Sequence, residues 1–307
     1  MKVVARSITR SLPRLNYVRG SWQPARGAVS SVMITAVRSG PSSGGSAVGP
    51  LLREWRQRRR LSQLSLALEA DVSQRHLSFV ESGRAQPSRE MVLHLAEHLG
   101  VPLRERNRLL VAAGYAPVFA ERSLEDPALE AARRAVERVL EGHEPFPALA
   151  VDRHWTLLAA NRAVGPLIAG AAASLLEPPV NVLRLSFHPD GLAPRIVNYA
   201  QWRTHILERL RHQVDVSADP TLATLLAELR DYPAPAARDR RPTLFGTAGD
   251  ASGVFVPLQL ETDAGVLSFI STTTVFGTPV DVTLAEIALE CFFPADAETV
   301  ERLRTGG

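Results

Sequence analysis

The stretch Leu61-Ser-Gln-Leu-Ser-Leu-Ala-Leu-Glu-Ala-Asp-Val-Ser-Gln-Arg-His-Leu-Ser-Phe-Val-Glu-Ser-Gly-Arg84 decides how the first half of this chain folds. Ser62 and Ser73 each stand before an apolar run of helical period, which is the place of an N-cap residue. Ala67 stands where two helices would cross and only a small side chain fits, and Asp71-Val72 forms the turn between them. This spacing predicts a helix-turn-helix, whose second helix enters the DNA major groove by its N-terminal residues.

Further short helices surround this stretch. Apolar residues recur at helical spacing in tightly spaced segments that are bounded by Ser caps, Pro and Gly. We expect helices at residues 51–59, 62–69, 73–81, 87–99 and 103–113. The sequence therefore predicts a compact all-α DNA-binding domain over residues 50–116.

This domain resembles the phage-repressor-like family of the xenobiotic response element type. The matching residues are Ser62-Gln63, Val72-Ser73, Glu81-x-Gly83-Arg84 and x-Pro87-Ser88. One departure is Asp71, where the family usually has Gly. That turn often needs a positive φ, which Asp tolerates better than most residues do.

The resemblance implies a set of DNA contacts. Gln74 would read an adenine edge, and Arg75 would read O6 and N7 of a guanine. The other implied DNA-binding residues line the groove or fix the register on the phosphates, and they are Gln63, Ser73, Ser78, Phe79, Arg84 and Gln86. The alternative is a helical module for protein contact alone, in which Arg75 is simply solvated.

Charge divides the chain into a basic front and an acidic back. Residues 1–50 hold seven basic side chains and no carboxylate, and residues 51–115 carry a formal charge of +4. Since the whole chain carries +3, residues 116–307 carry −8. A polyanion is therefore expected to meet the front of the chain. Within the front, Arg58-Arg59-Arg60 fits either a solvated face or a further phosphate contact.

Residues 1–49 are rich in Arg, Ser and Gly and show no sustained period, so we predict a disordered basic extension. Met33 is an alternative start of translation, which would remove residues 1–32 from the native protein. The longest uncharged apolar stretch, Ala163–Leu176, has 14 residues and contains Pro166, which is too short for a membrane span. The single cysteine, Cys291, excludes an internal disulfide and fits a reducing cytoplasm.

The second half of the chain has a mixed pattern. Residues 117–147 are predicted to form a helical connector, in which Asp126-Pro127 starts a helix. Residues 148–307 are predicted to form an α+β domain with strands at 148–151, 155–160, 254–260 and 266–274 and helices at 162–169, 200–213, 220–230 and 297–304. We interpret Asn161 as a helix cap and Trp155 as core. Residues 283–293 carry both a capping box and strand alternation, and we favour a strand.

Several longer motifs resemble the MmyB-like transcription regulators over about residues 50–305. They include Leu51-Leu-Arg-Glu-Trp-Arg56, Pro102-Leu-Arg-Glu-Arg-Asn107, Glu144-Pro-Phe-Pro-Ala148, Asp152-Arg-His-Trp155, His188-Pro-Asp-Gly191 and Phe292-Phe-Pro-Ala-Asp296. The resemblance implies a PAS-like ligand-binding and dimerisation domain over residues 148–307, with an antiparallel sheet and with helices across one face that enclose a pocket. It also implies a small apolar ligand of fatty-acyl type.

Candidate ligand residues follow from that chemistry. Apolar wall residues would be Phe187, Ile196, Trp202, Ile206, Phe255, Phe269 and Phe276, although each also fits plain core. A carboxylate head would need a cation or a donor, and the candidates are Arg184, His188, Arg195, Arg203 and His205.

Enzyme chemistry finds little support. His188-x-Asp190 and the pair His205 and His212 offer too few metal ligands, and H-E-x-x-H, P-loop and G-x-G-x-x-G motifs are absent from the sequence. We expect no catalytic residue, no metal and no cofactor beyond the ligand itself.

We interpret the chain as a bacterial, ligand-responsive transcription factor of the cytoplasm and nucleoid. Its expected partners are double-stranded DNA, bound as a homodimer on half-sites about one helical turn apart, and a small apolar ligand, with no membrane partner. One alternative is a constitutive repressor whose C-terminal domain only dimerises. The other is a C-terminal enzyme under the control of its own operator.

Overall fold

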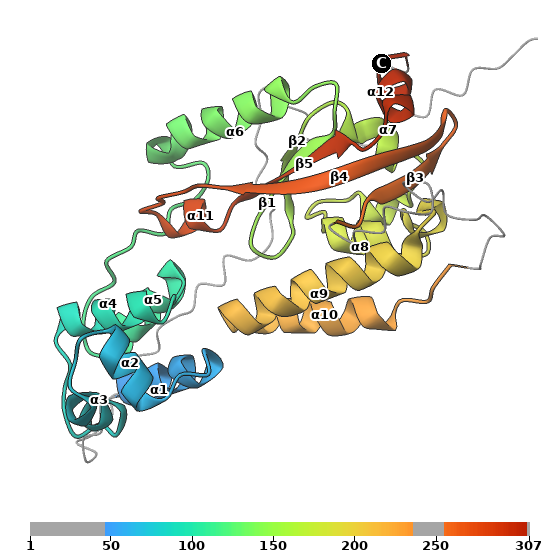
Figure 1. The fold of residues 1–307 in the computed structure, drawn as a ribbon. Helices are drawn as coiled ribbons and strands as arrows, with labels where there is room; N and C mark the ends of the chain where they lie inside the picture. The colour runs from blue at the N-terminus through green and yellow to red at the C-terminus, as the bar shows by residue number, and fades with distance from the viewer. Residues whose placement is uncertain (1–46, 236–254, 306–307) are drawn as a thin grey trace, which may run out of the picture.

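A computed structural model describes residues 47–235 and 255–305, and Figure 1 shows that they form a small helical unit and a larger unit built on a sheet. The predicted disordered extension over residues 1–49 lies almost wholly outside the described residues. Among the described residues, no helix is both long and apolar enough to cross a membrane.

The helical unit has the five helices that the sequence predicts: α1 (Val48–Arg58), α2 (Gln63–Glu69), α3 (Gln74–Glu81), α4 (Arg89–His98) and α5 (Leu103–Ala112). The hydroxyls of Ser62, Ser73 and Ser88 accept hydrogen bonds from the backbone amide three residues later, at 2.9, 3.0 and 3.2 Å. These bonds satisfy amides that have no partner within the helix, which is why α2, α3 and α4 begin where they do. Asp71 has the expected positive φ, +49°.

The core of this unit explains the turn between α2 and α3. Ala67 is 3% exposed and packs with Leu77 and Val80 of α3. On the other side of α3, a Cβ built on Gly49 of α1 would lie 2.4 Å from the carbonyl oxygen of Val80. Only glycine permits this close approach, so α1 fixes the position of α3 from behind.

The larger unit has five antiparallel strands in the order β2-β1-β5-β4-β3. Their bounds are β1 (Ala148–Val151), β2 (Leu157–Ala160), β3 (Leu258–Thr262), β4 (Gly265–Val275) and β5 (Ala288–Pro294). The helices around the sheet are η1 (Pro127–Leu129), α6 (Glu130–Gly142), α7 (Val164–Ile168), η2 (Ala173–Leu175), α8 (Val182–Phe187), η3 (Ala193–Arg195), α9 (Tyr199–Ser217), α10 (Pro220–Asp231), α11 (Val282–Ala285) and α12 (Ala297–Thr305). The expected α+β domain with an antiparallel sheet is confirmed.

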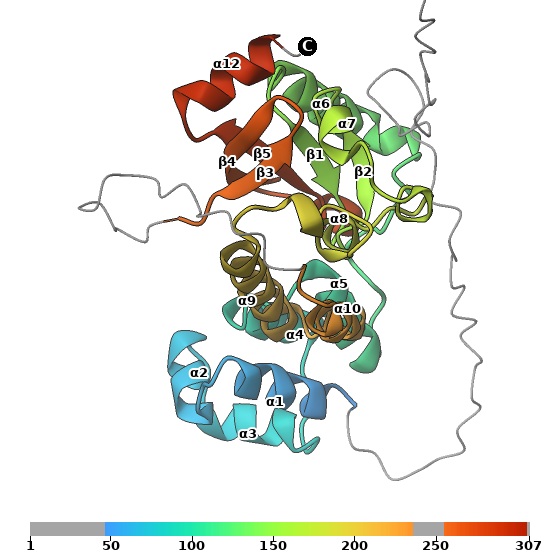
Figure 2. The ribbon, with the colours of Figure 1, turned by 90° about the vertical axis from the view of Figure 1, so that its right-hand side faces the viewer.

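Helices cover both faces of this sheet. α9 and α10 lie below it and α6 lies above it in Figure 1. Trp202 and Ile206 of α9 share one apolar cluster with Leu260 and Phe269 of the sheet. Val136 and Leu140 of α6 share another with the residues of β1 and β5 that point the opposite way. Figure 1 and Figure 2 show α9 and α10 below the sheet and beside the helical unit, and Arg59 of that unit donates to the Val216 carbonyl of α9.

Two local expectations were wrong or incomplete. Asn161 does not cap a helix, because α7 begins at Val164 without a side-chain cap. Its buried amide instead accepts from the Ala148 amide at 3.1 Å and donates to the carbonyls of Leu140 and Phe146. Residues 283–293 are not one strand, because the first residues lie in α11 and β5 starts at Ala288. The capping box is not formed either, since Asp281 caps α11 by accepting from the Thr283 amide.

Candidate nucleic-acid interface and ligand cavity

The N-terminal end of α3 presents polar side chains to solvent. Ser73, Gln74 and Arg75 are exposed, and Ser78 and Phe79 are half-buried. The guanidinium carbons of Arg75 and Arg84 lie 5.4 and 5.9 Å from the centre of the Phe79 ring. Within the described residues neither arginine makes an ion pair, so both cations remain free to meet phosphates or base edges.

Two of the residues that we predicted to contact phosphates donate hydrogen bonds within the protein. Gln63 Nε2 donates to Glu81 Oε2 at 2.8 Å, and Gln86 Nε2 donates to the carbonyl of Ala113 at 2.6 Å. Each amide has a second N–H. A phosphate contact by either residue would therefore use that remaining donor.

The arginines of the basic run Arg58-Arg59-Arg60, which precedes α2, have different partners. Arg58 pairs with Glu54 on the exposed face of α1 at 2.7 Å. Arg59 donates to the carbonyls of Leu99, Gly100 and Val216, at 2.8, 3.0 and 3.2 Å. Since Val216 belongs to α9, Arg59 links the two units of the molecule. It does not form a solvent-exposed basic face together with Arg58 and Arg60.

An apolar cavity lies between the sheet and helices α8 and α9. Its volume is about 110 Å³. Side chains from the inner face of the sheet form one wall, and helices form the other. The lining residues are Leu149, Trp155, Leu157, Val164, Ile168, Val182, Leu183, Leu185, Ser186, Leu192, Trp202, Ile206, Arg209, Leu258, Ser271, Glu290 and Phe292.

One ion pair lies at this cavity. Arg209 of α9 donates to both carboxylate oxygens of Glu290 on β5, at 2.5 and 3.1 Å. Thr273 of β4 bonds to both partners, and the Trp155 ring lies 4.7 Å from the guanidinium carbon. The charged end of the cavity is thus internally neutralised and hydrogen-bonded.

The structure distributes the predicted apolar wall residues over several places. Trp202 and Ile206 line the cavity, and Phe187, Ile196 and Phe269 belong to the core cluster around them. Phe255 is 51% exposed. Phe276 packs on the opposite, α6 face of the sheet.

None of the predicted cations lines this cavity. Arg184 pairs with Glu228, Arg203 donates to the last carbonyls of α10, and the His188 ring packs on Tyr232. His205 lies against the Trp202 ring, at 5.8 Å between centroids. The cation at the cavity is Arg209, which the sequence analysis did not select. Glu290 could have indicated this cation, because a carboxylate in the otherwise apolar run of β5 needs a partner of opposite charge when it is buried.

Arg195 lines a different and larger surface groove of about 1080 Å³, between α7, the β3–β4 hairpin and α12. Its guanidinium donates to the carbonyls of Leu167, Ala169 and Glu261. Burial lowers the pKa of Arg195 from its ordinary value. The side chain mainly ties α7 to the hairpin.

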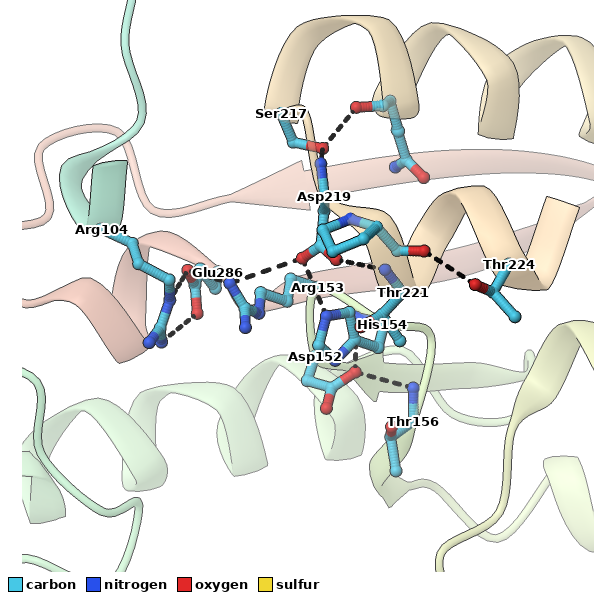
Figure 3. A network of polar contacts seen from close by, with 12 residues as sticks. Arg104, Asp152, Arg153, His154, Thr156, Ser217, Asp219, Thr221, Thr224 and Glu286 are labelled. Carbon is cyan, nitrogen blue, oxygen red and sulfur yellow. Dashed lines mark hydrogen bonds and ion pairs between the residues drawn. The ribbon is translucent and has the colours of Figure 1, made fainter. Parts of the chain in front are cut away.

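A polar cluster joins the two units, and Figure 3 shows it. Arg104 of α5 donates to both oxygens of Glu286, at 2.8 and 2.9 Å, and these bonds raise the pKa of Arg104. Arg153 lies 3.5 Å from Glu286 and from Asp219, and His154 Nε2 lies 2.9 Å from Asp219 Oδ2. We call Arg104, Arg153, His154, Asp219 and Glu286 the interunit cluster.

The cavity and the interunit cluster share one turn of the chain. Residues 152–155 connect β1 to β2, and Asp152 Oδ1 holds the turn by accepting from the amides of His154 and Thr156 at 2.8 Å. Arg153 and His154 face the cluster, whereas the next residue, Trp155, lines the cavity and has a φ of +66°. The cavity wall and the interunit cluster therefore take neighbouring residues of one turn.

Comparisons with known proteins give two family matches. The model described as "Helix-turn-helix" matches residues 52–106, and the model described as "MmyB-like transcription regulator ligand binding domain" matches residues 132–305. No curated protein matches the chain.

Similar solved structures cover only a small share of this chain. A crystal structure of the clp gene regulator ClgR from Corynebacterium glutamicum is 27% identical over 24% of this chain and 92% of its own, with a TM-score of 0.21. A second ClgR structure is 29% identical over 33% of this chain and 93% of its own, with a TM-score of 0.20. The restriction-modification controller protein C.AhdI from Aeromonas hydrophila is 33% identical over 20% of this chain and 92% of its own, with a TM-score of 0.19.

Proposed function

Because the chain belongs to the MmyB-like transcription regulators, we propose that a small apolar ligand, held in the cavity between the sheet and α9, regulates how its helix-turn-helix binds DNA. The observation that carries this proposal is the turn at residues 152–155, which contributes Trp155 to the cavity wall and Arg153 and His154 to the interunit cluster. There Arg153 lies 3.5 Å from Glu286, and the Glu286 carboxylate accepts two charge-assisted hydrogen bonds from Arg104 of the DNA-binding unit.

The coupling would work through the position of this turn. A ligand that enlarges the cavity pushes on Trp155 and Arg209, which pack against each other. A displaced turn then moves Arg153 and His154 relative to Glu286 and Asp219, and so loosens or tightens the hold on Arg104 of α5. Regulation requires that the ligand binds the DNA-competent and DNA-incompetent arrangements with different affinity.

The protein would read DNA as a homodimer, through α3 of each copy. A single α3 exposes Gln74 and Arg75 to base edges, which specifies only a few base pairs. Two copies on half-sites about one helical turn apart would reach the specificity that a bacterial genome demands. The site of action would be the nucleoid in the bacterial cytoplasm, where the DNA partner lies.

The cavity supports a sensing role over a purely dimerising one, since a domain that only dimerises has no need of an internal space lined by apolar side chains. It gives a catalytic role less support, because Arg209 and Glu290 neutralise each other. As the ligand class we propose an acyl compound or another apolar molecule of similar character.

Native mass spectrometry and operator selection test this function together. The mass of protein purified from its own host is measured under native and under denaturing conditions. The effect of the adduct on affinity for the selected operator is then measured. We expect a dimer with an adduct whose removal changes operator affinity. Equal operator affinity with and without saturating adduct would overturn the regulatory part of the proposal.

A pair of variants locates the coupling. Glu286→Gln weakens the bidentate contact with Arg104, whereas Glu228→Gln weakens the comparable contact with Arg184, which joins α10 to α8 outside the interunit cluster. We expect the first variant to bind adduct normally and to lose most of its effect on operator affinity. The second should respond as the unchanged protein does, and an equal loss in both would contradict the route through Glu286.

A further inference from the structure

One edge of the sheet has no neighbouring strand over half of its length. β3 pairs with β4 only as far as Phe269, whereas β4 continues beside β5 to Val275 (Figure 1). Within the described part of the chain, residues 270–275 therefore have β5 on one side and neither a strand nor an isolated bridge on the other. Residues 272–275 are exposed. We call residues 270–275 the free edge of β4.

The pairing of β4 with its neighbours shows which backbone groups are free. The carbonyl of Ser268 accepts from the amide of Ala295, the residue after β5, at 2.8 Å. In an antiparallel sheet, successive residues direct their amide and carbonyl to opposite sides of the strand. The amides and carbonyls of Ser271, Thr273 and Val275 therefore point away from β5, to the side where β3 has ended. Unpaired groups of this kind form a template for a further strand.

The free edge carries none of the features that keep an edge strand from pairing. Charged side chains, proline and β-bulges serve this purpose in other proteins. Here no residue between Asp263 and Asp281 is charged, and residues 270–275 include no proline. β4 also follows β5 in regular register through Val275, without a bulge. Its β-branched residues favour an extended strand, so the free edge is suited to pairing.

A second copy of this chain matches the free edge group for group. An uncharged strand can pair with itself about a two-fold axis without bringing like charges together. In an antiparallel pair centred on Thr273, Ser271 of one copy lies opposite Val275 of the other, and every free amide donates to a free carbonyl of the other copy. A shift by two residues leaves Ser271 or Val275 without a free partner. The same register places Thr272 opposite Thr274, and β-branched hydroxyl pairs of this kind stabilise sheets.

We propose that two copies of this chain pair through the free edges of β4, as antiparallel strands centred on Thr273, and so form one continuous sheet. This inference rests on the proposed homodimeric reading of DNA and names the surface that forms the homodimer. The paired strand also borders the ligand cavity, because Ser271 lines it and Thr273 bonds to Arg209 and Glu290. The axis of the dimer therefore lies beside the cavity.

Charges at two positions that lie opposite each other test both the surface and the register. Thr272→Lys/Thr274→Lys brings like charges together twice across the axis, and we expect the dissociation constant of the dimer to rise at least about tenfold. Thr272→Lys/Thr274→Glu brings opposite charges together at the same places. It should return the constant to within about threefold of the value of the unchanged protein. Sedimentation equilibrium of the full-length proteins over a range of concentrations measures these constants.

A matched control carries the same added charge away from the free edge. Ala223→Lys/Ala227→Lys places two lysines on the exposed face of α10 and should leave the dissociation constant unchanged. Thermal melting followed by circular dichroism checks that each variant is folded. If the Thr272→Lys/Thr274→Lys variant is not folded, hydrogen exchange of the unchanged protein decides. The amides of Ser271, Thr273 and Val275 should be protected in the dimer and exchange rapidly after dilution to the monomer.

Three results would overturn the proposal. A dimer that persists in Thr272→Lys/Thr274→Lys would show that the copies meet elsewhere, and the homodimeric function would stand. Equal weakening in both charge variants would contradict the pairing centred on Thr273. An unchanged protein that is monomeric at every concentration would exclude the sheet dimer, and protected free-edge amides in that monomer would show that another segment of the same chain covers the edge. Two copies on one operator would then still support homodimeric reading, whereas a single copy would remove it as well.

Discussion

Two arginine–glutamate pairs of similar geometry lie in the two units of this molecule, and their surroundings differ. In the helical unit, Arg56 and Glu81 form bonds of 2.6 and 2.8 Å, and their side chains are 9% and 2% exposed. In the ligand domain, Arg209 and Glu290 form bonds of 2.5 and 3.1 Å, with side chains 23% and 5% exposed. The first pair lies in close-packed core, and the second lies at a cavity.

The two pairs also have different further partners. Arg56 also donates to the carbonyl of Leu61, and Glu81 also accepts from Gln63, so that pair ties α1, α2 and α3 into one body behind the recognition helix. Arg209 instead contacts the Trp155 ring, which is part of the cavity wall. The same chemistry therefore joins three helices in one unit and neutralises the charged end of the cavity in the other.

The largest effect should come from breaking the first pair. Glu81→Ala leaves the Arg56 charge buried without compensation, and we expect the helical unit to lose about 3–5 kcal/mol of unfolding free energy. Hydrogen exchange over residues 48–112, measured by mass spectrometry, reports this unit separately from the rest. Glu54→Ala, which removes the exposed partner of Arg58, is the control and should cost about 0–1 kcal/mol. Equal losses in the two variants would show that Arg56 is solvated after all.

The matching change in the ligand domain should cost less. Glu290→Ala removes the partner of a guanidinium that is 23% exposed, so water and the Trp155 ring can compensate in part. We expect a loss of about 1–3 kcal/mol, the range for one unsatisfied buried group, measured by exchange over residues 148–294. If this loss equalled that of Glu81→Ala, the contrast between a pair in packed core and a pair at a cavity would be wrong.

The recognition helix allows a comparison within the helical unit itself. We expect Arg75→Ala to weaken binding to the selected operator by about 1–3 kcal/mol and to relax specificity at one base pair. Arg84→Ala should weaken binding to all sequences alike and reduce the salt dependence, as loss of a phosphate contact does. Titration of fluorescent operator variants at two salt concentrations measures both effects. An unchanged sequence preference in Arg75→Ala would contradict base reading by this residue.

How far the sequence predicts the molecule also differs between the units. The helical unit depends on neighbours in the chain: Ser62 and Ser73 bond to amides three residues away, and Asp71 occupies a turn that needs a positive φ. Spacing rules describe such contacts directly, so the helices and the recognition surface could be predicted closely. The uses of Gln63 and Gln86 could not, because Glu81 and Ala113 lie far from them in sequence.

The cavity depends on residues that are distant in sequence. Arg209 and Glu290 are separated by 81 positions, and no periodicity relates them. The cations selected from composition, such as Arg184 and Arg203, are bound by Glu228 and by the carbonyls of α10, and only the folded chain reveals these partners. Strands and helices of this domain could be predicted from pattern, whereas the choice of which arginine lies at the cavity needed the register of β5 against β4 and the position of α9.

The smallest expected effect is a pH-dependent change in stability at Asp219 of the interunit cluster. Burial alone would raise the pKa of Asp219, but the hydrogen bonds from His154 and the Thr221 amide outweigh it and hold this pKa below its ordinary value. A carboxylate with a lowered native pKa stabilises the folded state above its unfolded pKa, and this contribution is lost as pH falls through the native value. Asp219→Asn keeps the cap on α10, because Asn also caps helices, and removes the charge together with the carboxylate oxygen 2.9 Å from His154 Nε2. We therefore expect its melting temperature to lie slightly below that of the unchanged protein near pH 7 and to converge with it as pH falls below about 4. Asp231→Asn, at the exposed end of α10, controls for the loss of one negative charge, and a constant difference at every pH in Asp219→Asn would show that Asp219 serves only as a cap.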